Sequence, residues 1–221
     1  MIKKVLIICI LFFITSCEIQ YDAETKIVVT GKIVDENDNP LSNQDIYVTI
    51  VGEGFLQPNS DIISYGKSDQ NGNYTLIFPA PKGDYPISIS INEYYQNNSV
   101  YEDKTILATI ENFKNYKLNL NKIKLYKKES ITTLQLFLNT TSTNRQVTDI
   151  KIEGKQTNNF IDLNSAQNNS NNFENFFYIT KNQTVNLKYT TADFSSGVAI
   201  LTNHSVLIPI LSDAVTYTIT Y

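Results

Sequence analysis

Apolar residues recur at every second position through most of this chain of 221 residues. Because successive side chains of a β-strand point to opposite faces, a period of two predicts strands with one buried face. Segments rich in Asp, Asn, Gly and Pro separate these strands and favour tight turns, and such spacing predicts β-sandwiches or barrels. The inward residues expected in the first half are Ile27, Val29, Gly31 and Ile33, then Ile46, Val48 and Ile50, and then Tyr85, Ile87, Ile89 and Ile91.

The second half of the chain has the same alternation. With 221 residues, the chain is long enough for two domains of about 100 residues each, and its 42% of hydrophobic residues is enough to give each domain a buried core. We therefore expect an all-β fold of two consecutive β-sandwich domains, at residues 25–128 and 129–221, the second of no recognised family. The inward residues expected here are Leu134, Leu136 and Leu138, then Val185, Leu187 and Tyr189, and then Val215, Tyr217, Ile219 and Tyr221.

One segment of the first domain, residues 103–116, fits two interpretations. Its apolar residues lie at helical spacing, but two strands around a turn also fit, and the surrounding strands favour that second interpretation. In the next segment the alternation changes phase between Leu120 and Ile123. A change of phase within a strand indicates a β-bulge or an edge strand.

The N-terminus has the layout of a bacterial signal peptide: Lys3 and Lys4 precede ten apolar residues, Val5 to Ile14. A helix that spans a membrane needs about 20 apolar residues, so this run is too short for a permanent anchor. The following residues complete Ile-Thr-Ser-Cys, which resembles the lipobox of bacterial lipoproteins. The resemblance implies a cleaved signal peptide at residues 1–16, a lipid on Cys17 and an anchor linker at residues 17–24.

Two other interpretations of the cysteines are weaker. Cys9 lies inside the apolar run after Ile8, where a lipobox would have a small residue. A disulfide between Cys9 and Cys17 would join the mature chain to a segment that cleavage removes. Two or three acyl chains hold a protein stably, since each buried methylene contributes about 0.8 kcal/mol. We therefore expect attachment to the outer membrane, facing either the periplasm or the cell surface.

The charge of the chain limits the classes of partner that it is suited to bind. The formal net charge is -4, and removal of Lys3 and Lys4 with the signal peptide makes it -6. An acidic chain without a run of basic residues is poorly suited to nucleic acid or to anionic lipid. The expected partners are the membrane, through the lipid on Cys17, and an envelope protein or a glycan, but no nucleic acid.

Four motifs in the first domain occur in a characteristic order. They are Gly31-x-Ile33-x-Asp35, Pro40-Leu41, Asp69-x-x-Gly72-x-Tyr74 and Pro81-x-Gly83-x-Tyr85. Over residues 25–128 this order resembles the carboxypeptidase regulatory-like domain, a transthyretin-like β-sandwich common in cell-envelope proteins of Bacteroidetes. That family usually has glycine where Asp38 stands and a small residue near Asn43, and both Asp and Asn tolerate left-handed backbone. The resemblance implies a non-enzymatic module without metal ligands.

Catalytic and metal chemistry find little support in the sequence. His204 is the only histidine, and Ser205 beside it points to the opposite face of a strand, so the pair forms no triad. We expect a histidine in a loop or at a strand end, without a role. Zinc sites draw on several Cys and His ligands, which the mature chain lacks. We expect neither an enzyme nor a bound cofactor.

Two acidic turns supply the oxygen atoms that calcium prefers, at residues 35–39 and 69–73. Neither has the spacing of an EF-hand loop, and turn chemistry accounts for both. In the second, Asn71-Gly72 would form a left-handed turn that Asp69 stabilises by hydrogen bonds to the backbone. The alternation of Tyr74, Leu76 and Phe78 would then begin the next strand.

These observations together predict a lipid-anchored cell-envelope protein that acts as a non-catalytic binding, adhesion or scaffolding module. The alternative is a carbohydrate-binding surface lipoprotein of a glycan-uptake system. Tyr94 and Tyr95 are the ligand-binding candidates for it, since adjacent residues of a strand cannot both point inward. A glycosidase is a further alternative and would need two carboxylates about 5 to 10 Å apart in a cleft.

Overall fold

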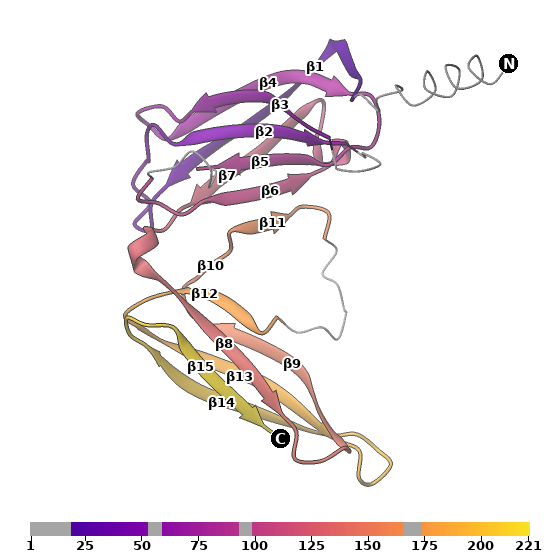
Figure 1. Ribbon diagram of the computed structural model, residues 1–221, viewed down its shortest axis with the longest axis vertical. Coiled ribbons are helices and arrows are strands. Elements are labelled where there is room, and N and C mark those ends of the chain that lie inside the picture. The colour runs from indigo at the N-terminus through magenta and orange to yellow at the C-terminus, as the bar shows by residue number, and fades with distance from the viewer. Residues whose placement is uncertain (1–18, 53–58, 93–98, 166–173) are drawn as a thin grey trace, which may run out of the picture. The chain divides into compact units, whose positions relative to one another are not determined.

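The computed structural model describes residues 19–52, 59–92, 99–165 and 174–221 (Figure 1). The chain is an all-β protein with two short 3-10 helices among these residues, η2 at Ile110–Asn112 and η3 at Lys128–Ser130. It forms two β-sandwich units, as the alternation predicted. The signal peptide and Cys17 lie outside the described residues, and among those described no helix has the length and apolarity to cross a membrane.

The two units exchange short segments of chain. Among the described residues, the first comprises 19–52, 59–92, Asp103–Lys124 and Phe160–Asn164. The second comprises 99–102, Leu125–Asn159, Ser165 and 174–221. A segment from the middle of the second half of the sequence therefore belongs to the first unit.

The first unit has a three-stranded sheet in the order β4-β1-β7 and a five-stranded sheet in the order β11-β6-β5-β2-β3. Strand β7 pairs in parallel with β1, and β11 pairs in parallel with β6, whereas the other pairs are antiparallel. The strands are β1 (Tyr21–Val34), β2 (Asp45–Val51), β3 (Ser60–Lys67), β4 (Asn73–Pro81), β5 (Ile87–Ile91), β6 (Lys104–Ala108), β7 (Lys117–Lys124) and β11 (Phe160–Asp162).

The core of the first unit is formed by the predicted inward faces. Side chains of β1, β2, β4 and β5 fill it, and Phe78 is among its largest fully buried members. Tyr85, expected inward, is half-buried and precedes β5. The buried residues that the alternation predicted are Ile27, Val29, Ile33, Ile46, Val48, Ile50, Tyr74, Leu76, Phe78, Ile87, Ile89 and Ile91.

The segment with two interpretations begins as a strand. Residues Lys104–Ala108 form β6, and the helical spacing continues only into the single turn of η2. The bulge predicted from the change of phase is confirmed, because the register of β7 against β1 shifts between Asn119 and Lys122. Asn121 takes a positive φ of 53° there. Strand β7 is also an edge of its sheet.

The second unit pairs a four-stranded sheet, β10-β12-β8-β15, with a three-stranded sheet, β14-β13-β9. Strand β15 runs parallel to β8, and the other neighbours are antiparallel. The strands are β8 (Ile131–Asn139), β9 (Arg145–Glu153), β10 (Gln156–Thr157), β12 (Phe176–Thr180), β13 (Gln183–Asp193), β14 (Ile200–Ile210) and β15 (Val215–Thr220).

The core of the second unit follows the alternation with one exception. Its buried cluster contains Leu134, Leu136, Val147, Ile152, Ile179, Val185, Leu187, Ile208, Ile210 and Ile219. Leu138 was expected inward but is 44% exposed. It lies near the end of β8, where the last three residues of the strand are all exposed. Alternation gives the face of a side chain but not how far the opposite sheet covers it.

Candidate functional site

A polar pocket of about 260 Å³ lies in the second unit, and strand β13 forms one wall of it. The inward face of β13 is aliphatic at Val185 and Leu187, and the same face continues with Tyr189, Thr191 and Asp193. Polar side chains therefore replace aliphatic ones toward the end of this strand. The lining residues are Arg145, Thr191, Ala192, Asp193, Thr202, His204, Thr220 and Tyr221.

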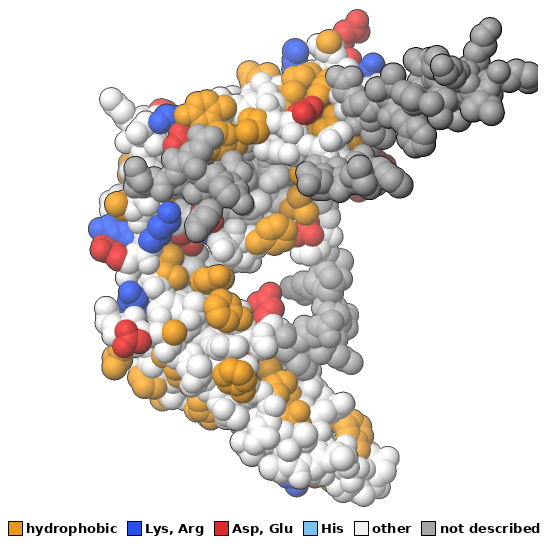
Figure 2. Space-filling model, in the orientation of Figure 1, with side chains coloured by type: hydrophobic (Ala, Val, Ile, Leu, Met, Phe, Trp, Pro, Cys, Tyr) orange, Lys and Arg blue, Asp and Glu red, His pale blue; other side chains and the backbone are white. Residues whose placement is uncertain are grey.

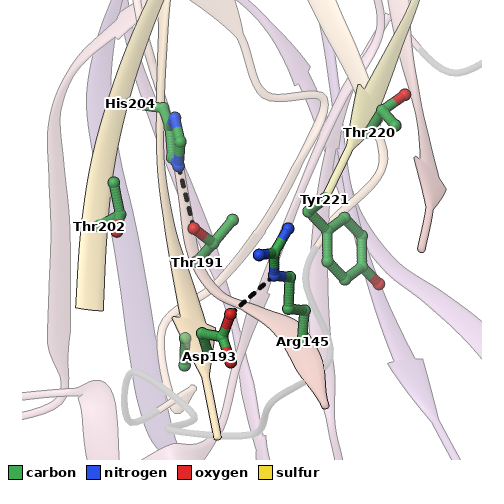
Figure 3. Close-up of a pocket in the computed structure, with 8 residues that line it drawn as sticks. Arg145, Thr191, Asp193, Thr202, His204, Thr220 and Tyr221 are labelled. Atoms are coloured by element: carbon green, nitrogen blue, oxygen red, sulfur yellow. Dashed lines mark hydrogen bonds and ion pairs between the residues drawn. The ribbon is translucent and has the colours of Figure 1, made fainter. Parts of the chain in front are cut away.

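The register of the sheet brings these side chains together. Tyr189 lies opposite His204, and Thr191 lies opposite Thr202, on β14. On the other side of β13, Asp193 lies opposite Arg145 of β9. Pairs directly opposite on one sheet face are close enough for contact. The residues from β9, β13 and β14 therefore share one inward face, and Figure 3 shows the side chains of Arg145, Thr191 and His204 directed toward a common space.

The polar groups of the pocket are engaged with one another. The His204 ring stacks on Tyr189 with ring centroids 4.5 Å apart and 10° between the planes. His204 Nε2 and the Thr191 hydroxyl form a hydrogen bond of 2.9 Å. Arg145 Nε donates to Asp193 Oδ2 at 2.8 Å. Figure 3 draws the last two of these contacts.

Two groups here have shifted pKa values. Hydrogen bonds from Ser195, and then from Arg145, lower the pKa of Asp193 to about 2. Burial raises the pKa of Tyr189, with a smaller contribution from Tyr217. Asp193 is therefore ionised and matched by the Arg145 cation over the physiological pH range.

The arrangement around His204 does not form a catalytic triad. His204 lies within β14 and not in a loop or at a strand end, which corrects the prediction from sequence. The prediction that Ser205 faces the other way is confirmed, since its hydroxyl donates to Asn186 Oδ1 at 2.7 Å on the opposite face. The carboxylate that lines the pocket, Asp193, is held by Arg145 and Ser195. The hydroxyl within reach of His204 is that of Thr191, but the Asp193 carboxylate bonds to Arg145 and Ser195 and does not orient the His204 ring, so the pocket can bind a small polar group without a Ser-His-Asp type triad.

The two acidic turns have the same construction. Asp69 Oδ1 accepts from the backbone N–H groups of Asn71 and Asn73, each at 2.8 Å. Asp35 Oδ1 accepts in the same way from residues two and four positions later, also at 2.8 Å. Of the pair Asn71-Gly72 predicted to form the left-handed turn, Gly72 has a positive φ, +78°, whereas Asn71 does not. These carboxylates hold their own turns, as predicted for Asp69.

The other site residues considered from the sequence either form no metal site among the described residues or lie outside them. The structure has no group of three or more His, Cys, Asp or Glu side chains able to hold a metal among the residues it describes. Tyr94 and Tyr95, the predicted carbohydrate-binding candidates, lie outside those residues. Cys17 does as well, so its lipidation stays a prediction.

A second feature, which was not predicted from the sequence, lies on the outer side of the four-stranded sheet. It consists of Phe137, Phe176 and Tyr178, and we term it the aromatic face. Their exposed fractions are 48%, 43% and 40%. The Phe176 and Tyr178 rings meet edge to face with centroids 5.3 Å apart. Gln135 lies opposite Phe176, and the hydroxyl-bearing Thr218 lies opposite Phe137. Figure 2 shows hydrophobic side chains exposed at several places on this unit. The alternation in β12 predicts this outward position.

No protein-family model matches the chain, and no curated protein sequence is similar to it. Solved structures do match. The shaft pilin spaA from Lactobacillus rhamnosus GG is 12% identical, with 89% of this chain and 97% of the pilin covered and a TM-score of 0.33. The tip fimbrial protein Mfa3 from Porphyromonas gingivalis, with a C-terminal truncation, is 9% identical, with 82% of each chain covered and a TM-score of 0.26.

An enzyme is also among the matched structures. A 9R-lipoxygenase from Cyanothece PCC8801 is 19% identical with a TM-score of 0.29, and the match covers 50% of this chain but only 18% of the lipoxygenase. Similarities with such low identities and TM-scores do not identify an activity.

Proposed function

We propose that this chain is a bacterial lipoprotein of the cell envelope, attached to the outer membrane through Cys17, that acts as a non-catalytic binding, adhesion or scaffolding module. The aromatic face carries the binding part of the proposal, because contiguous exposed apolar surface marks interaction sites. Pilin and fimbrial proteins among the matched structures are consistent with such a role at a coarse level. The carboxypeptidase regulatory-like resemblance of residues 25–128 supports a module without catalysis.

The polar pocket supports the non-catalytic part. A triad needs a histidine that reaches a hydroxyl and a carboxylate that orients the histidine. In this pocket His204 is stacked on Tyr189 and bonded to the Thr191 hydroxyl, but the Asp193 carboxylate is bonded to Arg145 and not to the His204 ring. Each ionisable group holds another side chain in place, as in a structural network.

The anchor is tested by metabolic labelling with a fatty acid that carries an alkyne. We expect label on the wild-type chain and on Cys9→Ser, and none on Cys17→Ser. The Cys17→Ser chain should also leave the membrane fraction, because its lipid contributes most of the membrane affinity. Label on Cys17→Ser, or its loss in Cys9→Ser, would refute the assignment of Cys17.

The aromatic face is tested by adhesion of cells that display the chain. Removing two ring faces by Phe176→Ala with Tyr178→Ala should reduce the number of attached cells at least tenfold, since aromatic side chains dominate interface energetics. Phe194→Ala is the matched control, because Phe194 is 42% exposed in the same unit but outside the aromatic face. Equal attachment of all three chains would exclude the aromatic face as the binding surface.

A carbohydrate ligand is the second candidate, favoured by the neutral polar residues Gln135 and Thr218 around the rings. Sugars stack their apolar faces on aromatic rings and hydrogen-bond to neutral polar side chains. A neutral oligosaccharide that binds here should raise the melting temperature of the wild-type chain by several degrees. The double alanine variant should show no rise. No shift with any member of a panel of neutral and acidic oligosaccharides would remove this candidate.

A further inference from the structure

Strand β14 is a long sheet edge whose outer side has no neighbouring strand within the described residues. It spans Ile200–Ile210 and pairs with β13 along its whole length. Figure 1 shows it at the margin of its sheet. The strand contains no charged residue, and Leu201 and Leu207 are 64% and 71% exposed. Long uncharged edges with exposed apolar side chains are templates for pairing with another strand.

The other sheet edges carry the features that oppose such pairing. Charges, proline and short length are the usual protections of an edge strand. Strand β15 is also uncharged, but it has six residues to the eleven of β14. The protected edges are β3 with Asp61 and Lys67, β4 with Pro79 and Pro81, β7 with Lys117, Lys122 and Lys124, β9 with Arg145, Asp149, Lys151 and Glu153, β10 with two residues and β11 with three.

The backbone groups that β14 presents follow from its register. The Thr148 hydroxyl of β9 donates to the Thr190 carbonyl oxygen, so Thr190 directs its backbone groups toward β9. In an antiparallel strand the N–H and C=O of one residue point to the same side. Asn203, opposite Thr190, therefore directs its backbone groups away from β13. Alternate residues share this direction, so the free edge is formed by Leu201, Asn203, Ser205 and Leu207.

Pro209 agrees with this assignment. It has the same parity as the free-edge residues, and proline is tolerated in a strand where its missing N–H would face outward. It also limits the edge, since pairing beyond Leu207 would lack a donor at Pro209. The usable edge therefore runs from Leu201 to Leu207.

This edge is complementary to itself. We propose that two copies of the chain pair through antiparallel β14 strands, with a twofold axis at His204. The axis places Leu201 opposite Leu207 of the other copy, and Asn203 opposite Ser205. All four residues have outward backbone groups, so every such pair can exchange two backbone hydrogen bonds. A leucine faces a leucine and a neutral polar residue faces another, with no charge left unmatched.

A second copy suits this edge better than a strand of another protein. Twofold pairing requires one patch to complement itself, and the sequence Leu-x-Asn-x-Ser-x-Leu meets this requirement about its centre. No charged residue of β14 selects an oppositely charged partner. A single strand pair buries less than a standard interface, so the predicted dimer exchanges with monomer in solution.

Cysteine cross-linking tests the register. The background is the full chain with Cys9→Ser and Cys17→Ser, in which every thiol is an introduced one. Mixing Leu201→Cys with Leu207→Cys chains should give a disulfide-linked dimer, because opposite residues lie about 5.5 Å apart. Each variant alone should cross-link at least tenfold less, since identical positions lie six residues apart along the paired strands. Equal cross-linking of each variant alone would overturn this register.

Light scattering across a concentration series tests the dimer itself, in the same serine background. Wild-type β14 should give a mass that rises toward that of two chains, and Leu207→Lys should raise the dissociation constant at least tenfold. Leu207 is 71% exposed, so lysine leaves the monomer folded. Ile77→Lys is the matched control, since Ile77 is 60% exposed on β4. A monomeric mass up to 1 mM, or equal weakening by both lysines, would refute the proposal.

Discussion

Gly72, in the second acidic turn, is predicted to be harder to replace than Gly197, which has a similar backbone conformation. The φ of +78° at Gly72 is strained for any other residue, and an added Cβ would lie less than 3.0 Å from the carbonyl oxygen of Ile33. Gly197 has nearly the same φ, +80°, but its Cβ would meet nothing within 4 Å. The two Gly→Ala substitutions therefore share the cost of the backbone conformation and differ in the steric contact.

The backbone cost of alanine in the left-handed region is about 1–2 kcal/mol. For Gly197→Ala this is the whole expected loss of unfolding free energy in its unit. For Gly72→Ala the turn must also move away from Ile33, which is fully buried. Ile33 donates to the Gly72 carbonyl at 2.8 Å and accepts from Leu41 at 3.0 Å. Leaving a buried backbone group unpaired costs about 1–3 kcal/mol, so the total is about 2–5 kcal/mol.

Amide hydrogen exchange followed by mass spectrometry measures both variants, because peptides from each unit report the opening free energy of that unit. We expect Gly72→Ala to lower protection of the β1 and β4 peptides by about 2 kcal/mol more than Gly197→Ala lowers that of β13 and β14, a difference set by the unpaired buried group. Circular dichroism of both variants checks that they remain folded. If the two variants lowered the opening free energies of their units by amounts that agree within about 0.5 kcal/mol, the positive φ alone, and not the contact with Ile33, would account for the cost of replacing Gly72.

Three further predictions concern the pocket, the core and the acidic turns. Because the folded pKa of Asp193, about 2, lies below its ordinary value of 3.8, its stabilising contribution is present above pH 4 and lost as the pH falls toward 2; Asp193→Asn should remove that part of the acid transition in urea unfolding. Leu136→Ala should cost about 2–5 kcal/mol and Leu138→Ala less than about 1 kcal/mol in urea unfolding, since Leu136 is 1% exposed and Leu138 is 44% exposed. Calcium should leave the melting temperature unchanged, because Asp69 already accepts two backbone hydrogen bonds, and a rise in melting temperature with calcium would contradict this account. Asp69→Ala should lower the free energy of unfolding by about 1–2 kcal/mol.

The sequence predicted which face of a strand is buried more reliably than it predicted strand partners. Ile87, Ile89 and Leu134 are buried because side chains of a strand must alternate between its faces, whatever the neighbours are. The turns were also predictable, since Asp69 and Gly72 act within five residues of chain. Both kinds of feature depend on the geometry of a few consecutive residues, so a short stretch of sequence is enough to predict them.

The direction of strand pairing, and the pairing of strands far apart in the sequence, could not be predicted from short sequence windows. The parallel pairs β1–β7 and β8–β15 have the same period of two as antiparallel pairs, so alternation does not distinguish them. Strand β11 joins β6 over a separation of more than 50 residues. His204 was predicted in a loop or at a strand end, but it lies within β14, where several of its neighbours are polar. Those polar neighbours face either the pocket or the outer side of the sheet.

The lipid proposed on Cys17 would favour the proposed pairing of β14, because anchoring raises the local concentration of the chains. A strand pair of this size is weak in dilute solution, because association loses translational and rotational freedom. Anchoring to one membrane confines the chains to a thin layer, which raises their effective concentration as a linker does between two binding modules. An edge that is mostly monomeric in solution can then be mostly paired on the membrane. The uncharged edge from Leu201 to Leu207 would therefore have a use in the anchored chain that it lacks in a soluble one.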